Sequence, residues 1–179
     1  MLYSYNQLCR LIDNGVISNA SHDNVNSASV DMVLGRRIMV EKQEYKVIDM
    51  LDKSSSHMTI IEMDDDGFVV PPGACVLAES VEIFNLPNNI SAEYKLKSTM
   101  ARNFFNHLNA GWADAGWNGS VLTLEFVNHN QYHSVRIKPG IKCGQMIFFE
   151  HEEVPVEASY ATRGQYNGDK ETTPGKGLK

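Results

Sequence analysis

The residues best suited to chemistry lie in one segment, KSTMARNFFNHLNAGWADAGWNGSVLTLE, from Lys97 to Glu125. It opens with a cation and two hydroxyls, Lys97, Ser98 and Thr99, and Arg102 follows three residues later. Cations and hydroxyls suit phosphate oxygens. The segment lacks the GxxxxGK[ST] pattern of a P-loop. An ordinary polar turn that caps a helix with Ser98 or Thr99 would explain the same residues.

Glu125 is a carboxylate within the apolar strand pattern Leu122 to Val127. With a period of two residues, Thr123, Glu125 and Val127 share one face of that strand. The spacing alone favours a solvated face, which is where Glu is usually found. In a half-dry cleft the same side chain would serve as a general base, which contributes roughly 10²- to 10⁴-fold in rate.

Asp114 lies in a glycine-rich turn between Trp112 and Trp117. Asp is favoured in turns, and we expect at least one of the tryptophans to pack in the interior, so a purely structural explanation is available. The functional alternative is a carboxylate that contacts a sugar hydroxyl or a hydrolytic water.

The histidines and cysteines do not suggest a metal centre. The six histidines and three cysteines are scattered, without an HExxH pattern or a CxxC pair. We therefore expect no zinc, and a hydrolytic water would need a carboxylate to activate it. Any metal would be Mg²⁺ carried on phosphate oxygens.

The bulk composition indicates one globular domain with small-molecule rather than nucleic-acid partners. The chain has 179 residues, 42% of them hydrophobic, and a net charge of -6. That charge argues against a nucleic-acid surface, although it permits a small anionic ligand. The odd number of widely spaced cysteines favours a reducing compartment. Without a signal-peptide pattern or an apolar run of roughly 18 residues, we expect a cytoplasmic protein with no membrane partner.

The elements that must position these residues are one helix followed by many short strands. Residues 4–14 have helical spacing, with Ser4 before the first turn and Asn14-Gly15 after the last. We expect polar loops at 18–29 and 52–67 and a helical turn within 100–108. Strands are expected at 30–35, 38–40, 45–50, 74–78, 81–84, 121–128, 134–137 and 143–150. Gly, Pro and Asn turns between them predict an all-β barrel or jelly roll.

The end of the chain differs in composition from the rest. After Val156 it is polar and glycine-rich and has no packing period. We expect residues 1–157 to form one β domain and residues 158–179 to form a flexible tail, ordered by a ligand or a neighbour.

Six segments in order resemble the dCTP deaminase family of the trimeric dUTPase-like superfamily. They cover nearly the whole chain, and six motifs in order are far more specific than any one of them. They are SASVDMVLG at 27–35, VPPGACVLAESVEIFNLP at 70–87, KSTMAR at 97–102, AGWADAGWNG followed by LTLEF at 110–126, PGIKCGQMIF at 139–148, and RGQYNGDKETTP at 163–174.

The resemblance implies a distorted jelly roll or β-barrel with a short N-terminal helix, assembled as a homotrimer with active sites between subunits and a C-terminal lid over them. It implies deamination of dCTP to dUTP and ammonia, with Mg²⁺ on the triphosphate and no zinc. Glu125 would take a proton from the water that attacks C4 of cytosine.

The same resemblance assigns roles to other residues. Ser98 and Arg102 would hold the water, the base and the phosphates, and the carbonyl of Ala110 would position the water. Asp114 would lie near the sugar and, in the dUTPase branch, serve the hydrolytic water. Trp117 would lie beside the nucleotide. Further substrate-binding positions are Lys97, Thr99, Gln145, Tyr160, Tyr166 and Lys170.

The chain departs from the family pattern in four places. Lys97 stands where Arg is usual, which replaces a bidentate fork by a point charge. Glu125 lies one residue further from Asp114, which a β-bulge would absorb. In the tail, Gln165 replaces the usual Lys, and Asp169 replaces the usual Gln. The added anion needs Mg²⁺ or a cation of the tail to offset it, the candidates being Lys170 and Lys176. These changes leave open whether triphosphate or monophosphate is preferred.

Three functions therefore remain open. Deamination of dCTP to dUTP leads, because the second candidate shares it. That second candidate is bifunctional and also cleaves the triphosphate to give dUMP and pyrophosphate. The AGW at 110–112 favours it, because AHR is usual in monofunctional members. The third is a non-catalytic nucleotide-binding regulator, which the altered tail favours and the presence of Glu125, Ser98 and Arg102 argues against. Further candidate ligands are dUTP and, as an inhibitor, dTTP.

Overall fold

The computed structural model describes residues 1–53 and 57–178. Positions 54–56 of the expected polar loop, and residue 179 of the tail, lie outside the described residues. The helices are α1 (Tyr5–Asp13), the 3₁₀ turn η1 (His22–Asn24), α2 (Ser98–Arg102) and α3 (Tyr160–Arg163). The strands are β1 (Ile17–Ser18), β2 (Val30–Glu41), β3 (Met58–Glu62), β4 (Phe68–Val70), β5 (Cys75–Asn85), β6 (Ile90–Leu96), β7 (Phe105–His107), β8 (Trp112–Ala113), β9 (Asn118–Asn128), β10 (Val135–Ile137) and β11 (Lys142–Glu150).

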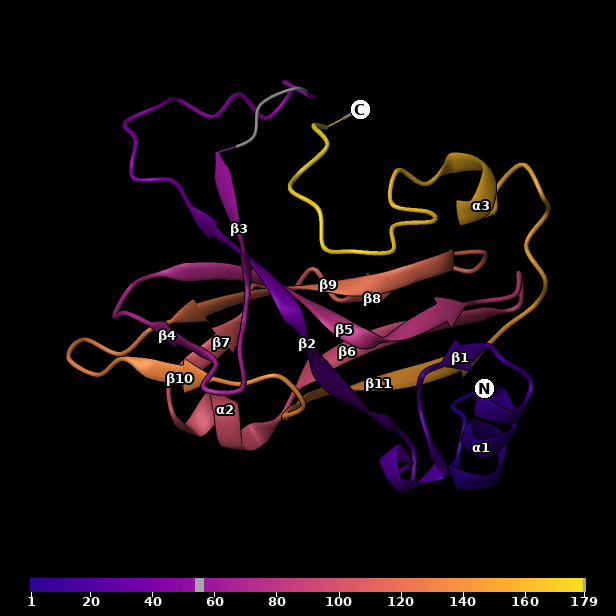
Figure 1. Cartoon of the computed structure of the whole chain (residues 1–179). Helices are drawn as coiled ribbons and strands as arrows, with labels where there is room; N and C mark the ends of the chain where they lie inside the picture. Colours follow the sequence, from indigo (N-terminus) through magenta and orange to yellow (C-terminus); the bar gives the residue numbers. More distant parts are fainter. Residues whose placement is uncertain (54–56, 179) are drawn as a thin grey trace.

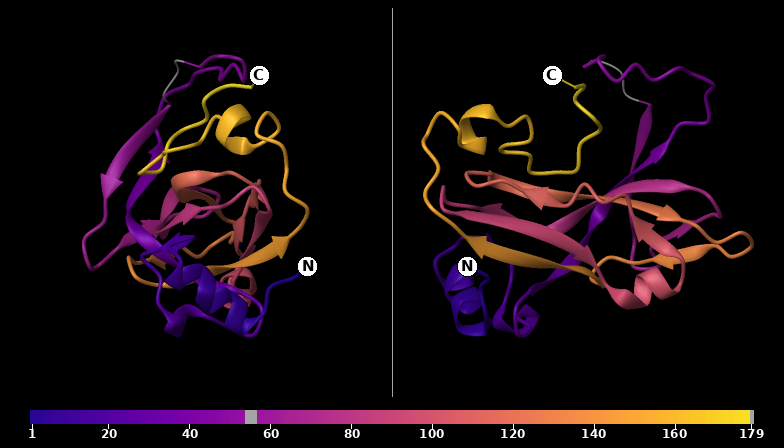
Figure 2. Two further views of the ribbon diagram at one scale, coloured as in Figure 1. Left: turned by 90° about the vertical axis from the view of Figure 1, so that its right-hand side faces the viewer. Right: turned by 180° about the vertical axis from the view of Figure 1, so that it is seen from behind.

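One large antiparallel sheet forms the body of the molecule. Its strand order is β7-β9-β5-β2-β11-β6-β8, with β1 added on β5 and β3 on β2, and β4 and β10 form a separate ribbon. The two ends of that order, β7 and β8, are joined directly by residues 108–111. Such a short link spans at most roughly 15 to 20 Å, so the two ends must approach each other. The sheet is accordingly curled, with β9 and β11 on opposite sides of the core (Figures 1 and 2). The predicted all-β barrel-like fold is confirmed.

The alternation in β9 follows the predicted period of two. Leu124 and Phe126 are fully buried in the core, opposite Ala78 and Val76 of β5. Glu125 faces the other way and is half-buried. Burial of each large apolar side chain contributes about 1.5 to 3 kcal/mol, so the core residues determine the register in which Glu125 is presented.

The helix α1 confirms the prediction for residues 4–14. The backbone N–H of Ser4 donates to the Gln7 side chain at 3.1 Å, and Leu8 and Leu11 are buried. Gly15 follows the helix with φ of 72°, a conformation that glycine adopts without strain.

Several strand predictions need correction. The segments 30–35 and 38–40 form one strand, β2, and the segments 74–78 and 81–84 form one strand, β5. Both strands contain register shifts, and these break the period without ending the strand. Residues 45–50 are not a strand, because in the described structure they are exposed and join no β-ladder. The strands that were not predicted are β1, β3, β4, β6, β7 and β8, and β3 lies within the segment 52–67 that was expected to be a polar loop. The helical turn expected within 100–108 begins earlier, because α2 covers Ser98–Arg102.

A β-bulge lies between Asp114 and Glu125, as the altered spacing suggested. Phe84 pairs with Ser120 and Asn85 pairs with Asn118, so Gly119 is the extra residue of β9. Its φ is 65°, in the left-handed region that favours glycine. Beyond the bulge, Glu125 pairs with Leu77.

Glu82 of β5 is a carboxyl group with no exposed surface. Both of its oxygens accept the N–H of Val33, at 3.2 and 3.1 Å. Burial raises the pKa of Glu82 to about 7, although the backbone hydrogen bond opposes that rise.

The C-terminal segment crosses the β9 side of the sheet, away from α1 (Figures 1 and 2). Val121 N–H donates to the Asp169 carbonyl at 2.9 Å, and Thr172 N–H donates to the Glu79 carboxylate at 2.9 Å. Thr172 is only 1% exposed. The described tail thus packs on its own chain, and its flexibility stays a prediction. Of the described helices, none has the length and apolarity needed to cross a membrane.

Candidate active site

A cavity of about 370 Å³ lies between the C-terminal segment and β9. This volume suits a small ligand. The curled sheet supplies its floor, the turn between β8 and β9 supplies a wall, and the C-terminal segment covers it. Its lining residues are Leu77, Ala110, Trp112, Ala113, Asp114, Trp117, Val121, Leu122, Thr123, Glu125, Tyr160, Tyr166, Asp169, Thr173, Pro174 and Gly175.

The structure brings together about half of the predicted site residues. Those in the cavity are Ala110, Asp114, Trp117, Glu125, Tyr160 and Tyr166. They come from two parts of the chain that are far apart in sequence, 110–125 and 160–166, and the packing of the tail on β9 brings them together.

Glu125 points into this cavity, not into open solvent. Its side chain is 24% exposed, and its Oε2 lies 3.0 Å from Nε2 of His107. The distance is short enough for an ion pair, but neither atom forms a well-directed hydrogen bond with any described residue. The solvated face that the spacing favoured is therefore wrong: Glu125 lies in a cleft, and its role as a general base stays a prediction.

Asp114 and Trp117 are fixed by hydrogen bonds within the wall. The indole of Trp112 donates to Asp114 Oδ1 at 2.8 Å, which orients that carboxylate. Trp117 stacks on Phe84 at 5.3 Å between ring centroids, and its indole donates to the Tyr166 carbonyl at 2.9 Å. Trp117 therefore packs in the core, as the structural explanation proposed, and also connects the cavity wall to the tail.

The tail carries its own ion pair beside the cavity. Lys176 Nζ contacts the two oxygens of Asp169 at 2.8 and 2.6 Å and lies 4.8 Å from the ring centre of Tyr166. Lys176 is thus the cation that offsets the unusual Asp169. Tyr160 accepts the N–H of Tyr166 at 3.3 Å, and burial raises the pKa of Tyr160.

The predicted phosphate residues lie elsewhere. Ser98, Thr99 and Arg102 are exposed on α2, which Figure 1 places on the opposite side of the sheet from the tail. None of the three lines the cavity within this chain. Lys170 is exposed and does not line the cavity either. Its ammonium lies beside Gly119 of β9.

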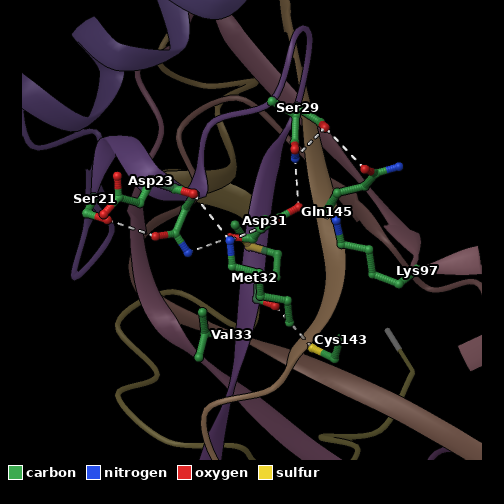
Figure 3. A network of polar contacts seen from close by, with 12 residues as sticks. Ser21, Asp23, Ser29, Asp31, Met32, Val33, Lys97, Cys143 and Gln145 are labelled. Carbon is green, nitrogen blue, oxygen red and sulfur yellow. Dashed lines mark hydrogen bonds and ion pairs between the residues drawn. The ribbon is translucent and has the colours of Figure 1, made fainter. Parts of the chain in front are cut away.

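Lys97 and Gln145 belong to a polar network around Asp31 (Figure 3). The Lys97 ammonium contacts Asp31 Oδ1, Lys142 lies 3.1 Å from Oδ2, and Asn26 donates to Oδ1 at 2.7 Å. Burial would raise the pKa of Asp31, but these hydrogen bonds outweigh it, and the pKa is lowered. Gln145 accepts from the Ser29 hydroxyl at 3.2 Å. Lys97 is therefore already paired within the chain, and the substrate contacts expected of it and of Gln145 stay predictions.

Sequence reasoning missed Thr123, Thr173 and His107. Thr123 was predictable, because the period of two puts it on the face of Glu125. His107 had no such signal, because β7 is only three residues long. Its closeness to Glu125 depends on the pairing of His107 with Phe126 across β7 and β9.

The donor groups of the described chain do not form a metal centre by themselves. No group of three or more His, Cys, Asp or Glu side chains within residues 1–53 and 57–178 could hold an ion.

Comparisons with known proteins agree with this fold. A family model described as dCTP deaminase-like matches residues 2–151. A dUMP-forming dCTP deaminase of Sulfurihydrogenibium sp. is 34% identical over 150 residues, which are 83% of this chain and 81% of that protein. A dUMP-forming dCTP deaminase of Corynebacterium jeikeium is 30% identical over 184 residues, covering 98% of this chain and 96% of that protein.

A solved structure supports the architecture. The 2′-deoxycytidine 5′-triphosphate deaminase from Agrobacterium tumefaciens matches with a TM-score of 0.66 at 19% identity, over 82% of this chain. The match covers 47% of that longer chain, so the likeness concerns the fold alone. Together with the match of the family model over residues 2–151, these relatives show that the chain belongs to the dCTP deaminase-like family.

Proposed function

We propose that this protein is a bifunctional dCTP deaminase, which converts dCTP and two waters to dUMP, ammonia and pyrophosphate. The observation that carries the proposal is that Glu125 and Asp114 line one cavity, beside the aromatic side chains of Trp117, Tyr160 and Tyr166. Two separate carboxylates can serve two hydrolytic waters. The names of the relatives favour this function over release of dUTP, which the sequence had placed first.

In the first half-reaction, Glu125 removes a proton from a water held by the carbonyl of Ala110. The resulting hydroxide attacks C4 of cytosine, the proton passes to the 4-amino group, and ammonia leaves a uracil ring. Glu125 thus returns to its carboxylate form. A positioned general base of this kind contributes roughly 10²- to 10⁴-fold in rate.

In the second half-reaction, Asp114 orients a second water for attack on the α-phosphorus of the uracil nucleotide. The bond to the bridging oxygen breaks, and pyrophosphate leaves with its negative charge. The hydrogen bond from Trp112 holds one oxygen of Asp114, which leaves the other oxygen to accept a proton from that water.

The triphosphate needs positive charge that the cavity does not supply. The described lining residues include three carboxylates, Asp114, Glu125 and Asp169, and no Lys or Arg. We propose a homotrimer in which Ser98 and Arg102 of a neighbouring copy contact the phosphates. Mg²⁺ bound to the nucleotide's phosphate oxygens would neutralise part of the phosphate charge.

The test is to incubate purified protein with dCTP and Mg²⁺ and to quantify dUTP, dUMP, pyrophosphate and ammonia. We expect equal amounts of dUMP, pyrophosphate and ammonia, with little free dUTP. Accumulation of dUTP alone would show a monofunctional deaminase. Nucleotide binding without turnover would show a regulator.

Two variants separate the half-reactions. Glu125→Gln should lose deamination by at least roughly 10²-fold while it still binds dCTP and still cleaves added dUTP. Asp114→Asn should keep deamination and release dUTP. If Glu125→Gln deaminates within a few-fold of the wild type, the role given to Glu125 is wrong.

A further inference from the structure

We infer that His107 is a positioning residue, which holds the Glu125 carboxylate and ties it to the turn that carries Ala110. The inference rests on the proposed function, because it assigns a role in the deamination step. It depends on three features of His107: its packing, its tautomer and the atom that it faces.

The ring of His107 is held in the interior by aromatic neighbours. The residue is 4% exposed, and its ring centre lies 4.7 Å from that of Tyr94 and 6.1 Å from that of Phe126. Tyr94 is itself fixed, because its hydroxyl donates to the Cys143 carbonyl at 3.2 Å. An imidazole packed in this way has little freedom to turn, so its two nitrogens have defined partners.

One of these nitrogens determines the tautomer. Nδ1 of His107 accepts the backbone N–H of Asn109 at 3.1 Å, so Nδ1 carries no proton. In a neutral imidazole the proton then belongs to Nε2. His107 therefore presents an N–H donor on the side that faces Glu125.

The other nitrogen faces the carboxylate. Nε2 lies 3.0 Å from Glu125 Oε2, and both atoms are buried without another hydrogen-bond partner in the described chain. A buried donor and a buried acceptor at this distance satisfy each other after a small change in angle. The contact restrains Oε2 and leaves Oε1 as the oxygen that can face the cavity and receive the proton of water.

The same residue also positions the turn beside the cavity. Asn109, whose N–H binds His107, has a left-handed φ of 64° and directly precedes Ala110. The adjacent Leu108 N–H donates to the backbone carbonyl of Glu125 at 2.9 Å. The general base and the carbonyl proposed to hold its water are thus connected through one imidazole. Misplacement of reacting groups by about 1 Å can cost roughly 10²-fold in rate.

Two substitutions at His107 separate the contact with Glu125 from the hydrogen bond with Asn109. In His107→Gln the side-chain amide reaches the position of Nε2 and can still donate to Glu125. In His107→Asn the side-chain oxygen lies near the position of Nδ1, so it can still accept from Asn109 but cannot reach Glu125. We expect His107→Asn to lower kcat for deamination roughly 10- to 100-fold, with KM for dCTP within a few-fold. His107→Gln should regain most of that loss.

A purely structural role would give a different pattern. It would lower the melting temperature and would reduce cleavage of added dUTP, which uses Asp114, along with deamination. We expect that cleavage to stay within a few-fold of wild type in both variants. Equal deamination by His107→Asn and wild type, or a parallel loss of both half-reactions, would overturn the inference.

A measurement on the nucleotide-free wild type tests the tautomer without any turnover. The ¹⁵N chemical shifts of the His107 ring should show a proton on Nε2 and none on Nδ1. A proton on Nδ1 would overturn the inference even if the enzyme deaminates dCTP as proposed. If the expected tautomer is found and no deamination occurs, the proposed function fails while the contact with Glu125 stands.

Discussion

The cavity under the C-terminal segment and the short helix α2 differ in charge, exposure and partners. The cavity has three carboxylates whose positions are set by contacts within the chain, such as the bonds to Trp112 and Lys176. The helix presents Ser98 and Arg102 to solvent, and no described residue forms an ion pair with that guanidinium. Under the proposed function, the cavity would take the uncharged part of the nucleotide and α2 its anionic part.

This difference supports our proposal that one chain of this fold contains two half-sites that face apart. A nucleotide has a nearly neutral base and sugar joined to a strongly anionic phosphate chain. If the halves act together, they must come from different copies of the chain.

Mixing two inactive variants tests the division most directly. Glu125→Gln damages only the cavity, and Arg102→Ala damages only α2. We expect each alone to lose at least roughly 10²-fold in deamination. After the two are unfolded together and refolded, random assembly should restore about a quarter of wild-type activity per site, because a quarter of sites combine two intact halves.

The matched control is a mixture of Glu125→Gln with Glu125→Ala, which should recover no activity. If the first mixture also recovers none, although mixed oligomers form, both residues act within one chain and the division is wrong.

Glu82 is a deeply buried carboxyl group that lies outside both the cavity and α2. Its pKa, raised by burial to about 7 from an ordinary 4.5, means that the folded protein binds this proton more tightly than the unfolded chain. The resulting stabilisation is complete below about pH 4.5 and is lost as pH rises through about 7. A pKa difference of this size corresponds to about 3 kcal/mol.

We therefore expect the free energy of unfolding of the wild type to fall between pH 5 and pH 8, and the Glu82→Gln variant to fall less by about 3 kcal/mol. Urea titrations across this range measure the difference. The exposed Glu62, changed to Gln, is the control and should leave the wild-type slope unchanged. Parallel curves for wild type and Glu82→Gln would contradict the prediction.

Breaking the ion pair of Asp169 with Lys176 should change the affinity for dCTP only modestly. Changing Asp169 to Gln removes an anion near the phosphates and frees Lys176, so dCTP should bind roughly a few-fold more tightly. The affinity is measured by calorimetry in the Glu125→Gln background, where dCTP is not consumed. The additional change Lys176→Ala should cancel the gain. Unchanged or weaker binding by Asp169→Gln alone would show that Asp169 lies away from the phosphates.

The sequence predicted which face of a strand a side chain occupies better than it predicted which strands pair with each other. The period of two in β9 correctly separated Leu124 from Glu125, because alternation is a local property of an extended chain. The residues at 45–50 also suggested a strand, and that prediction was wrong. A strand needs a neighbouring strand to pair with, and the local sequence does not show whether one is present. His107 was missed for the same reason, since only the pairing of β7 with β9 brings it to Glu125. The separation of α2 from the cavity likewise depends on the long-range curl of the sheet.

The bulge at Gly119 has a consequence for how such motifs can vary. A one-residue insertion in a regular strand turns every following side chain to the opposite face, which here would bury the carboxylate of Glu125 and expose Phe126. Here the extra residue is the left-handed Gly119 alone, so the strand beyond it keeps its face and Glu125 pairs with Leu77. The number of residues between Asp114 and Glu125 can therefore change by one while both carboxylates still line the same cavity. In this fold, the spacing of two carboxylates in the sequence therefore does not decide whether they line the same cavity.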